Sequence, residues 1–209
     1  MDHQVGISVY FRSVVRIVLA ILVIFLGQIC QSCVVGQPRS SQGFDDGRWA
    51  TPVEKPGLPN LHKVADEVYR GAQPTTQGFQ ELYKMGIKTV VNLRFRHSDL
   101  DVLGKIGLAY IEIPMNAWHP KDEDVVKFLQ IVTDPEKVPV FVHCQHGADR
   151  TGVMAASYRI IVQGWSKDQA IAEMTEGGFG FHAVWINLPR FIRNLNVDQM
   201  RKDLGLDEE

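Results

Sequence analysis

The feature that most constrains this chain is an apolar, β-type run that ends directly before a cysteine. From Val140 to Gly152 the sequence reads Val-Phe-Val-His-Cys-Gln-His-Gly-Ala-Asp-Arg-Thr-Gly. Residues 152–163 continue with the apolar, weakly polar pattern of a buried helix. The pattern predicts a strand, a short loop and a helix, with Cys144 at the carboxyl end of the strand.

The loop after Cys144 has the composition of an anion-binding loop. A short loop that enters a helix can turn its backbone N–H groups inward around an anion, with the helix dipole behind them. Gly147 supplies the φ freedom that such a curl needs. The same field favours a nucleophilic thiolate on Cys144. Arg150 offers a planar, charged fork that matches two phosphate oxygens, and Thr151 can hydrogen-bond the thiolate.

This stretch resembles the His-Cys-x5-Arg-Thr signature of the cysteine-dependent protein tyrosine and dual-specificity phosphatases. The resemblance spans residues 61–195, and Tyr69–Pro74 is similar to the opening strand of the smaller members. It implies a phosphomonoester hydrolase in which Cys144 forms a cysteinyl-phosphate, with His143 and Thr151 stabilising the thiolate. It also implies that the phosphate is bound by Gln145, His146, Gly147, Ala148, Asp149 and Arg150.

The rest of the chain alternates between strand and helix patterns. We expect strands at 67–72, 88–93, 108–113 and 138–142, and helices at 76–86, 98–105, 123–133, 152–163 and 187–201, with a further helix after the capping box at 166–169. This order predicts an α/β fold with a mostly parallel central sheet and helices on both faces, as in the dual-specificity phosphatases. Ligands of such sheets bind beyond the carboxyl ends of the strands, where Cys144 falls.

The N-terminal residues 1–33 have the pattern of a signal or anchor segment. Arg12 and Arg16 precede the apolar run Ile17–Leu26, so the positive-inside rule predicts a domain on the extracytoplasmic side of a membrane. No clean cleavage site follows. Cys30 and Cys33 lie just beyond the run, and Ser32-Cys33 loosely resembles a lipoprotein cleavage point, so cleavage, lipidation and an uncleaved single span all stay open.

Length and composition indicate one folded domain and an N-terminal extension. The chain has 209 residues, 45% of them hydrophobic, and a formal net charge of −2, which argues against a nucleic-acid surface. We expect a linker at 34–60, a monomeric phosphatase domain at 61–204 and a tail at 205–209. Cys144 is the one cysteine of the expected domain, so no intramolecular disulfide can remove it.

The residue that protonates the leaving group is the open part of the site. The family takes this acid from the loop before the active-site strand, but Pro114–Lys121 contains no carboxylate. Asp122 follows that loop, although an acid there also suits a helix N-terminus. Asp149 precedes Arg150, as in the loops of myotubularin-type and Sac-type phosphoinositide phosphatases, and it can also simply bond loop amides. His119 is the third candidate.

Several neighbouring residues have two readings. Arg94 and Arg96 follow a strand at the same sheet edge and can bind further phosphates or lie in solvent. Trp118 can form a wall beside the substrate or simply pack. No second cluster with metal-ligand spacing accompanies His143 and His146, and thiolate chemistry needs no metal, so we expect no cofactor.

Together these patterns predict a membrane-tethered or exported phosphatase with a phosphocysteine intermediate. The substrate stays open between a phosphorylated protein and a phospholipid or inositol phosphate. A rhodanese-type sulfurtransferase also cradles a cysteine in such a loop, but the Arg-Thr pair disfavours it. An inactive phosphate-binding module is the remaining alternative, and only the missing loop acid supports it.

Overall fold

The structure is a computed structural model that describes residues 49–206. The predicted signal or anchor segment at 1–33, the part of the predicted linker before residue 49 and residues 207–209 lie outside the described residues. Within the described range, no helix combines the length and the apolar character that a membrane span requires.

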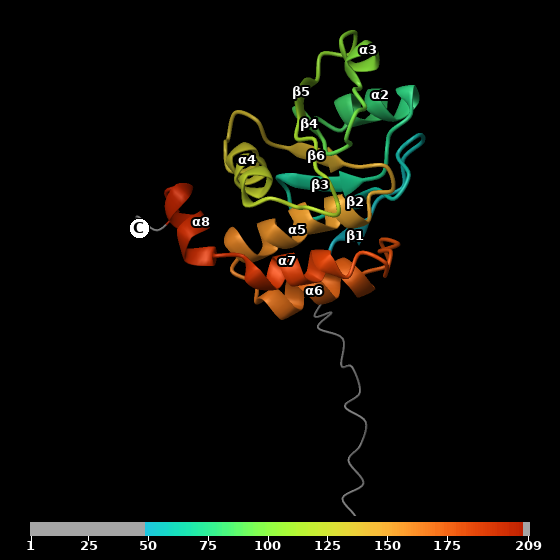
Figure 1. Cartoon of the computed structure of the whole chain (residues 1–209). Helices are drawn as coiled ribbons and strands as arrows, with labels where there is room; N and C mark the ends of the chain where they lie inside the picture. Colours follow the sequence, from blue (N-terminus) through green and yellow to red (C-terminus); the bar gives the residue numbers. More distant parts are fainter. Residues whose placement is uncertain (1–48, 207–209) are drawn as a thin grey trace, which may run out of the picture. The chain divides into compact units, whose positions relative to one another are not determined.

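A six-stranded sheet forms the centre of the described domain (Figure 1). In spatial order its strands are β1 (Thr51–Pro52), β2 (His62–Lys63), β3 (Val68–Gly71), β6 (Val140–His143), β4 (Thr89–Asn92) and β5 (Ala109–Glu112). The pairs β3–β6, β6–β4 and β4–β5 are parallel, and only β1–β2 and β2–β3 are antiparallel. The prediction of a mostly parallel sheet is therefore confirmed.

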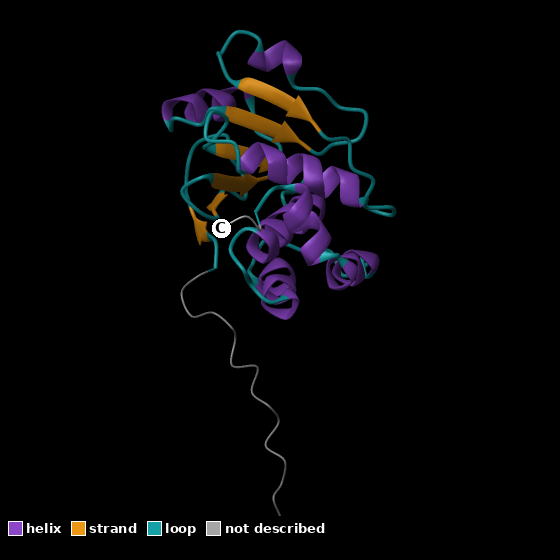
Figure 2. Ribbon diagram, turned by 90° about the vertical axis from the view of Figure 1, so that its left-hand side faces the viewer, coloured by secondary structure: helices purple, strands orange, loops and turns teal. Residues whose placement is uncertain are grey.

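Helices cover both faces of the sheet. One face carries α2 (Thr76–Lys84) and α3 (Leu100–Leu103), and the other carries α4 (Asp122–Val132), α5 (Asp149–Ile161), α6 (Lys167–Glu176), α7 (Asn187–Asn194) and α8 (Val197–Asp203). In Figure 2 the strands lie between these two sets. Because neighbouring strand residues point to opposite faces, Phe141 packs with α2 and α3 while Val140 and Val142 pack under α5. The predicted two-sided α/β fold is confirmed.

The helix ends follow local sequence signals. The Thr75 hydroxyl accepts from the Gly78 N–H at the start of α2, and Ser166 forms the predicted capping box with Gln169. The single helix predicted for 187–201 is wrong, because the chain breaks at Leu195 (ψ 132°) and the Asn196 side chain caps a new helix, α8. A periodic apolar face continued across the break and concealed it.

The domain also begins earlier than the predicted boundary at residue 61. Ala50 is buried, and its N–H donates to Glu173 Oε1 at 2.7 Å. The Val53 N–H donates to the Leu61 carbonyl at 2.9 Å, and Leu58 packs in the core. Residues 50–60, which we expected to be linker, therefore form part of the fold. At the other end Leu206 packs against the core, so the predicted tail at 205–209 begins too early.

The register of the parallel strands positions the site. His143 at the end of β6 pairs with Gly71 at the end of β3 on one side and with Asn92 at the end of β4 on the other. Three strands thus end level, and the chain segments that leave them meet at one edge. Cys144 is the first residue beyond this edge on the central strand.

Candidate active site

A cleft of about 520 Å³ opens at the carboxyl edge of the sheet. It lies between the loop after β6, the segments after β4 and β5, and the connection between α6 and α7. Its lining residues are Phe95, Met115, Asn116, Ala117, Gln145, His146, Asp149, Arg150, His182, Val184 and Trp185.

Cys144 lies at the base of the loop that borders this cleft. Its side chain is 1% exposed, and the loop runs from it into α5. The helix begins at Asp149, three residues earlier than the predicted start at Gly152, so Arg150 and Thr151 belong to its first turn. The first N–H groups of a helix have no intrahelical acceptor and carry the positive end of its dipole. The thiol is therefore followed by a short turn whose N–H groups are suited to bind an anion.

Gly147 allows the loop to approach the end of β3. Its φ is +71°, the conformation for which we expected a glycine. A Cβ at this position would lie 2.6 Å from the Ala72 nitrogen and closer still to the Gly71 carbonyl carbon. A side chain would therefore separate the loop from the strand.

Arg70 of β3 holds the buried side of the loop, which faces away from the cleft. No local sequence pattern indicated this role. Its Nη2 donates to the Gly147 carbonyl at 2.9 Å and to the Ala148 carbonyl at 3.3 Å. The guanidinium is 1% exposed and packs over the Phe179 ring at 3.8 Å. Burial lowers the pKa of Arg70 to about 10. Because these carbonyls point toward Arg70, the loop is held in one orientation from behind.

Asn60 holds the same loop at its solvent side. Its Nδ2 donates to the His146 carbonyl and to the Phe179 carbonyl, both at 2.9 Å. Asn60 has a φ of +55°, which asparagine tolerates better than most residues. We had placed this residue in the linker, so its contribution was also missed.

A buried polar network stands behind Cys144. His143 is fully buried, and its Nε2 lies 3.2 Å from Asp99 Oδ2. Gln73 Nε2 donates to Asp99 Oδ1 at 2.7 Å, and His97 Nε2 lies 3.3 Å from the same oxygen. Burial alone raises the pKa of Asp99, but its contacts with His143, Gln73 and His97 outweigh this and lower the pKa below its usual range. The network fixes the residue that precedes the cysteine.

The two arginines after β4 do not line the cleft. Arg94 Nη1 donates to Gln73 Oε1 at 2.8 Å, so this side chain extends the network behind Cys144. Arg96 has a φ of +58° and lies over the Phe95 ring at 5.2 Å. Among the described residues, Arg150 is the arginine that lines the cleft, and its Nη1 lies 3.4 Å from the Leu93 carbonyl.

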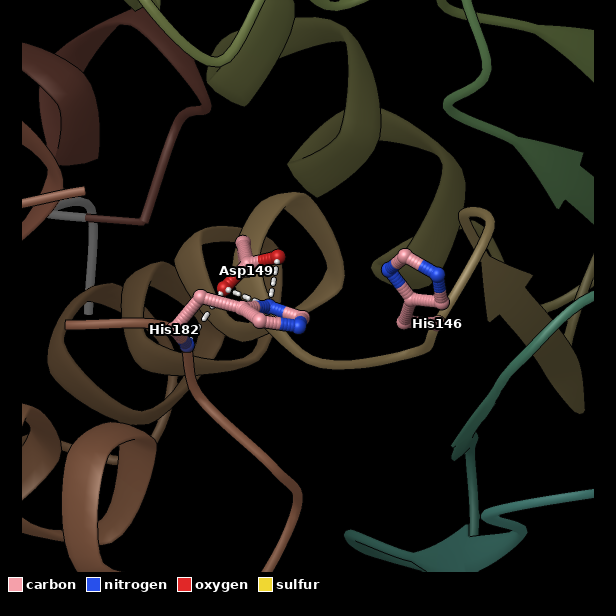
Figure 3. Close-up of side chains that lie close together, drawn as sticks. All are labelled: His146, Asp149 and His182. Atoms are coloured by element: carbon pink, nitrogen blue, oxygen red, sulfur yellow. Dashed lines mark hydrogen bonds and ion pairs between the residues drawn. The ribbon is translucent and has the colours of Figure 1, made fainter. Parts of the chain in front are cut away.

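Asp149 lies in the cleft and is bonded to His182 (Figure 3). The His182 backbone N–H donates to Asp149 Oδ1 at 2.9 Å, and its ring Nδ1 lies 2.9 Å from Oδ2 and 3.1 Å from Oδ1. His182 was not singled out from the sequence, because no local pattern connects it with a residue 33 positions earlier.

His146 completes a small polar cluster with this pair. Its ring centroid lies 5.2 Å from that of His182, and one ligand atom each of His146, Asp149 and His182 fall within 4.8 Å of one another. The three could reach one cation, a possibility that their spacing in the sequence does not reveal. Asp149 and His182 already satisfy each other directly, so the arrangement itself requires no cation.

The other predicted acid candidates lie outside the cleft. Asp122 is the first residue of α4, is exposed, and lines a separate surface depression with Lys121 and Asp124. His119 is also exposed and is not among the lining residues.

Thr151 is fully buried, and its hydroxyl has no hydrogen-bond partner within residues 49–206, which leaves it free to bond a neighbouring thiolate.

The loop at 114–121 forms the opposite wall and is attached to α7. Asn187 Nδ2 donates to the Ala117 carbonyl at 2.7 Å and to the Trp118 carbonyl at 3.3 Å. Trp118 is 59% exposed and meets Trp185 edge to face at 4.6 Å. Trp185 lines the cleft, whereas Trp118 supports it from outside.

Comparison with known proteins agrees with this geometry. A family model described as DSP-PTPase phosphatase fused to NAD+ kinase matches residues 54–185. The dual specificity protein phosphatase TpbA of Pseudomonas aeruginosa is 36% identical over 154 residues, which cover 73% of this chain and 69% of TpbA. The inositol diphosphatase SIW14 of Saccharomyces cerevisiae is 26% identical over 152 residues, covering 68% of this chain and 53% of SIW14.

Solved structures show the same likeness. The crystal structure of TpbA has a TM-score of 0.69 and 34% identity, and it covers 77% of this chain and 98% of the TpbA chain. A cysteine-to-serine variant of TpbA in complex with pTyr has a TM-score of 0.68 at 32% identity, with the same coverage. The catalytic core of SIW14 has a TM-score of 0.64 at 21% identity, covers 75% of this chain and 96% of that core, and supports the fold alone.

Proposed function

This chain belongs to the dual-specificity (DSP-PTPase) family of cysteine-dependent phosphatases, and we propose that it hydrolyses phosphate monoesters by transferring the phosphoryl group to Cys144. The observation that carries the proposal is the position of Cys144, buried at the base of an anion-binding turn that borders a cleft. Family membership argues against the sulfurtransferase, and the presence of both Cys144 and Arg150 argues against the inactive module.

The first step binds the phosphate and attacks it. The N–H groups of residues 145–150 and the Arg150 guanidinium hold the three equatorial oxygens, because they offer convergent donors at a helix N-terminus. The Cys144 thiolate attacks phosphorus in line with the ester oxygen, and the Thr151 hydroxyl stabilises the thiolate. His143, fixed by Asp99, keeps the cysteine at the end of β6. The product is a phosphocysteine, which water then hydrolyses.

The acid function, in this proposal, lies on the side of the cleft that Asp149 and His182 occupy rather than at Asp122. Asp149 lines the cleft, whereas Asp122 lies on a different surface at the start of α4. The loop at 114–121 contributes Met115, Asn116 and Ala117 to the cleft, and none of these can donate a proton to an alkoxide or phenoxide. The acid therefore comes from the side of the cleft beside the phosphate loop (residues 145–150), and not from the loop at 114–121 from which the family takes it.

Phosphotyrosine in a protein is the substrate that the cleft favours. The walls beside the phosphate loop are largely apolar: Phe95, Met115, Ala117, Val184 and Trp185. Such walls suit the flat ring of an aryl phosphate, which gains from packing against aromatic and aliphatic side chains. The similarity to TpbA, which has been solved with pTyr, supports the same choice.

An inositol phosphate is the second candidate, and the similarity to an inositol diphosphatase favours it. A polyphosphorylated ring needs several fixed cations, because each further phosphate seeks Arg or Lys donors. Among the described lining residues, Arg150 is the one arginine or lysine. The charge of the cleft thus favours a monophosphate.

Phosphate release from wild type and variants tests the proposal. Cys144→Ser should abolish turnover of a phosphotyrosine peptide while leaving the binding of inorganic phosphate and thermal unfolding nearly unchanged, and Arg150→Lys should lose most activity because a point charge cannot replace the fork. Turnover by Cys144→Ser within tenfold of wild type would reject the assigned nucleophile. Faster release from inositol hexakisphosphate than from the peptide would favour the second substrate class.

We further propose that residues 1–33 place this domain on the extracytoplasmic side of a membrane. The support is the run Ile17–Leu26 behind Arg12 and Arg16, which lies outside the described residues. Because the fold starts by Ala50, alkaline phosphatase should be fused after Gly47. An active fusion is expected, and a stable but inactive one would place the domain in the cytoplasm.

A further inference from the structure

We infer that His182 delivers the proton to the leaving oxygen, with Asp149 holding its ring. The inference rests on the proposed phosphatase reaction and identifies the residue that supplies the proton in that reaction. It makes His182 the donor and Asp149 a positioning residue.

Both carboxylate oxygens of Asp149 contact His182. The His182 backbone N–H occupies Oδ1 at 2.9 Å, and the ring Nδ1 lies within 3.1 Å of both oxygens. The Asp149 side chain is 9% exposed, whereas the His182 side chain is 47% exposed. The carboxylate oxygens are therefore directed at the histidine, and the histidine is directed at the space that receives substrate.

The ring geometry gives the second step. When Nδ1–H is donated to the carboxylate, the other ring nitrogen, Nε2, becomes the atom that can present a proton elsewhere. Figure 3 shows this nitrogen pointing away from Asp149, on the side of His146. A carboxylate that holds one ring nitrogen fixes the orientation of the imidazole and its tautomer.

The other groups that face His182 are weaker donors. The titratable and charged residues of the cleft are His146, Asp149, Arg150 and His182. Arg150 does not give up its proton in a protein. The His146 ring lies 5.2 Å from the His182 ring, but within the described part of the chain no hydrogen bond fixes it. His182 alone combines a titratable N–H with an orienting carboxylate.

The proposed step balances without any co-reactant. The Cys144 sulfur forms the S–P bond as the ester P–O bond breaks, and the leaving oxygen takes the electron pair of that bond together with the proton from His182 Nε2. The imidazole is then neutral. In the second half, water attacks phosphorus and gives its proton to Nε2, and the S–P bond breaks to release phosphate and the thiolate.

His182→Asn is the sharpest variant, because an asparagine amide can keep an N–H donor near the position of Nδ1 while Nε2 is removed. We expect its kcat on phenyl phosphate to fall by about two to four orders of magnitude, as general-acid loss does. The loss on p-nitrophenyl phosphate should be much smaller, since that leaving group needs little protonation. The alkaline limb of the kcat profile should also flatten. His182→Gln serves as a second variant if His182→Asn does not fold.

Asp149→Asn should act differently. Its alkaline limb should persist, because His182 Nε2 is still present, and its kcat on phenyl phosphate should fall less than that of His182→Asn, because an amide oxygen can still accept from Nδ1–H. His119→Gln, an exposed histidine outside the cleft, is the matched control and should behave as wild type. All assays contain EDTA, so a cation held by the polar cluster cannot account for the result.

The inference is overturned if His182→Asn and His182→Gln lose activity equally on both substrates, or stay within threefold of wild type on phenyl phosphate. It is also overturned if the leaving-group dependence appears in Asp149→Asn alone, which would make Asp149 the direct donor. Turnover by wild type and by Cys144→Ser is measured in parallel. If Cys144→Ser abolishes turnover, the proposed function stands whichever result is found for His182.

Discussion

Arg70 Nη2 donates to the carbonyl of Gly147 across 2.9 Å, and thereby joins β3 to a loop 77 residues later in the chain. Because the Gly147 carbonyl accepts from Arg70, it points away from the centre of the phosphate loop. The centre is thereby left to the neighbouring backbone N–H groups. A fully buried arginine at the back of the loop thus complements the half-buried Arg150 fork at its front. The phosphate site is built from both sides.

Replacement of Arg70 should damage the phosphate site without touching the cleft. In Arg70→Met the Gly147 and Ala148 carbonyls lose their donor while buried, which costs about 1–3 kcal/mol. We expect weaker vanadate binding and a kcat/KM that is lower by about fivefold to a hundredfold if this cost falls on the phosphate-binding conformation, since 1.4 kcal/mol corresponds to a factor of ten. Lys63→Met, on the neighbouring strand β2, is the control, because Lys63 contacts the exposed Asp66 and the Tyr69 ring and bonds no carbonyl of the loop in the described residues. Equal vanadate affinity in wild type and Arg70→Met would contradict this role.

A side chain at Gly147 should be poorly tolerated for two separate reasons. Gly147→Ala combines a positive φ with a Cβ that meets the backbone of β3, whereas Gly178 has a similar φ and no described atom within 4 Å of the position that a Cβ would take. Gly178→Ala should therefore cost about 1 kcal/mol for the backbone conformation alone. Gly147→Ala should cost clearly more in urea unfolding and should also lower activity. Equal losses would show that the loop can move away from β3.

The network behind Cys144 should make stability depend on pH in the acid range. The pKa of Asp99 is lowered in the fold, so its ionised form stabilises the folded state at pH values above its unfolded pKa of about 3.9. This contribution is lost as pH falls from that value through the folded pKa. Asp99→Asn should lower Tm near neutral pH and show a shallower decline below about pH 4. Parallel Tm curves for the two proteins down to acid pH would refute the linkage.

The buried pair Arg159–Glu173 should be a sensitive point for folding. Arg159 Nη2 and Nε donate to the two Glu173 oxygens at 2.7 and 2.8 Å, and Ala50 N–H also donates to Glu173. Glu173→Ala leaves a buried guanidinium without its carboxylate, which costs about 3–5 kcal/mol. Chemical unfolding measures this.

A double variant serves as its control. Arg159→Met combined with Glu173→Leu removes both charges and should recover much of the lost stability, because apolar side chains of similar volume often replace a buried pair at little cost. If the double variant is no more stable than Glu173→Ala, packing at this site rather than an uncompensated charge explains the loss.

The sequence alone determined what local order can determine. The strand that ends at His143, the thiol of Cys144 and the arginine of the next helical turn follow one another without interruption, so their relative placement depends only on strand, loop and helix geometry. The alternation of apolar strands with helices likewise predicted the layered sheet. This is possible because the spacing of apolar residues along a short segment already distinguishes a strand from a helix. The same locality explains why the break at Leu195 escaped notice.

The tertiary structure decided which distant residues complete the site. Four distant residues complete the site: Asn60 and Arg70 bond carbonyls of the phosphate loop, Asp99 lies against His143 behind it, and His182 bonds Asp149. These contacts join residues 33 to 86 positions apart. Arg70 lies in the segment Tyr69–Pro74 that resembles the family, but no local pattern indicated any of the four contacts. Their placement depends on strand register and on how the α6–α7 connection closes over the sheet edge. The partner of a carboxylate cannot be predicted from the sequence when that partner is brought to it only by the complete fold. For that reason Asp122 and Asp149 were both candidates by pattern, and only the packed chain placed Asp149 in the cleft beside His182.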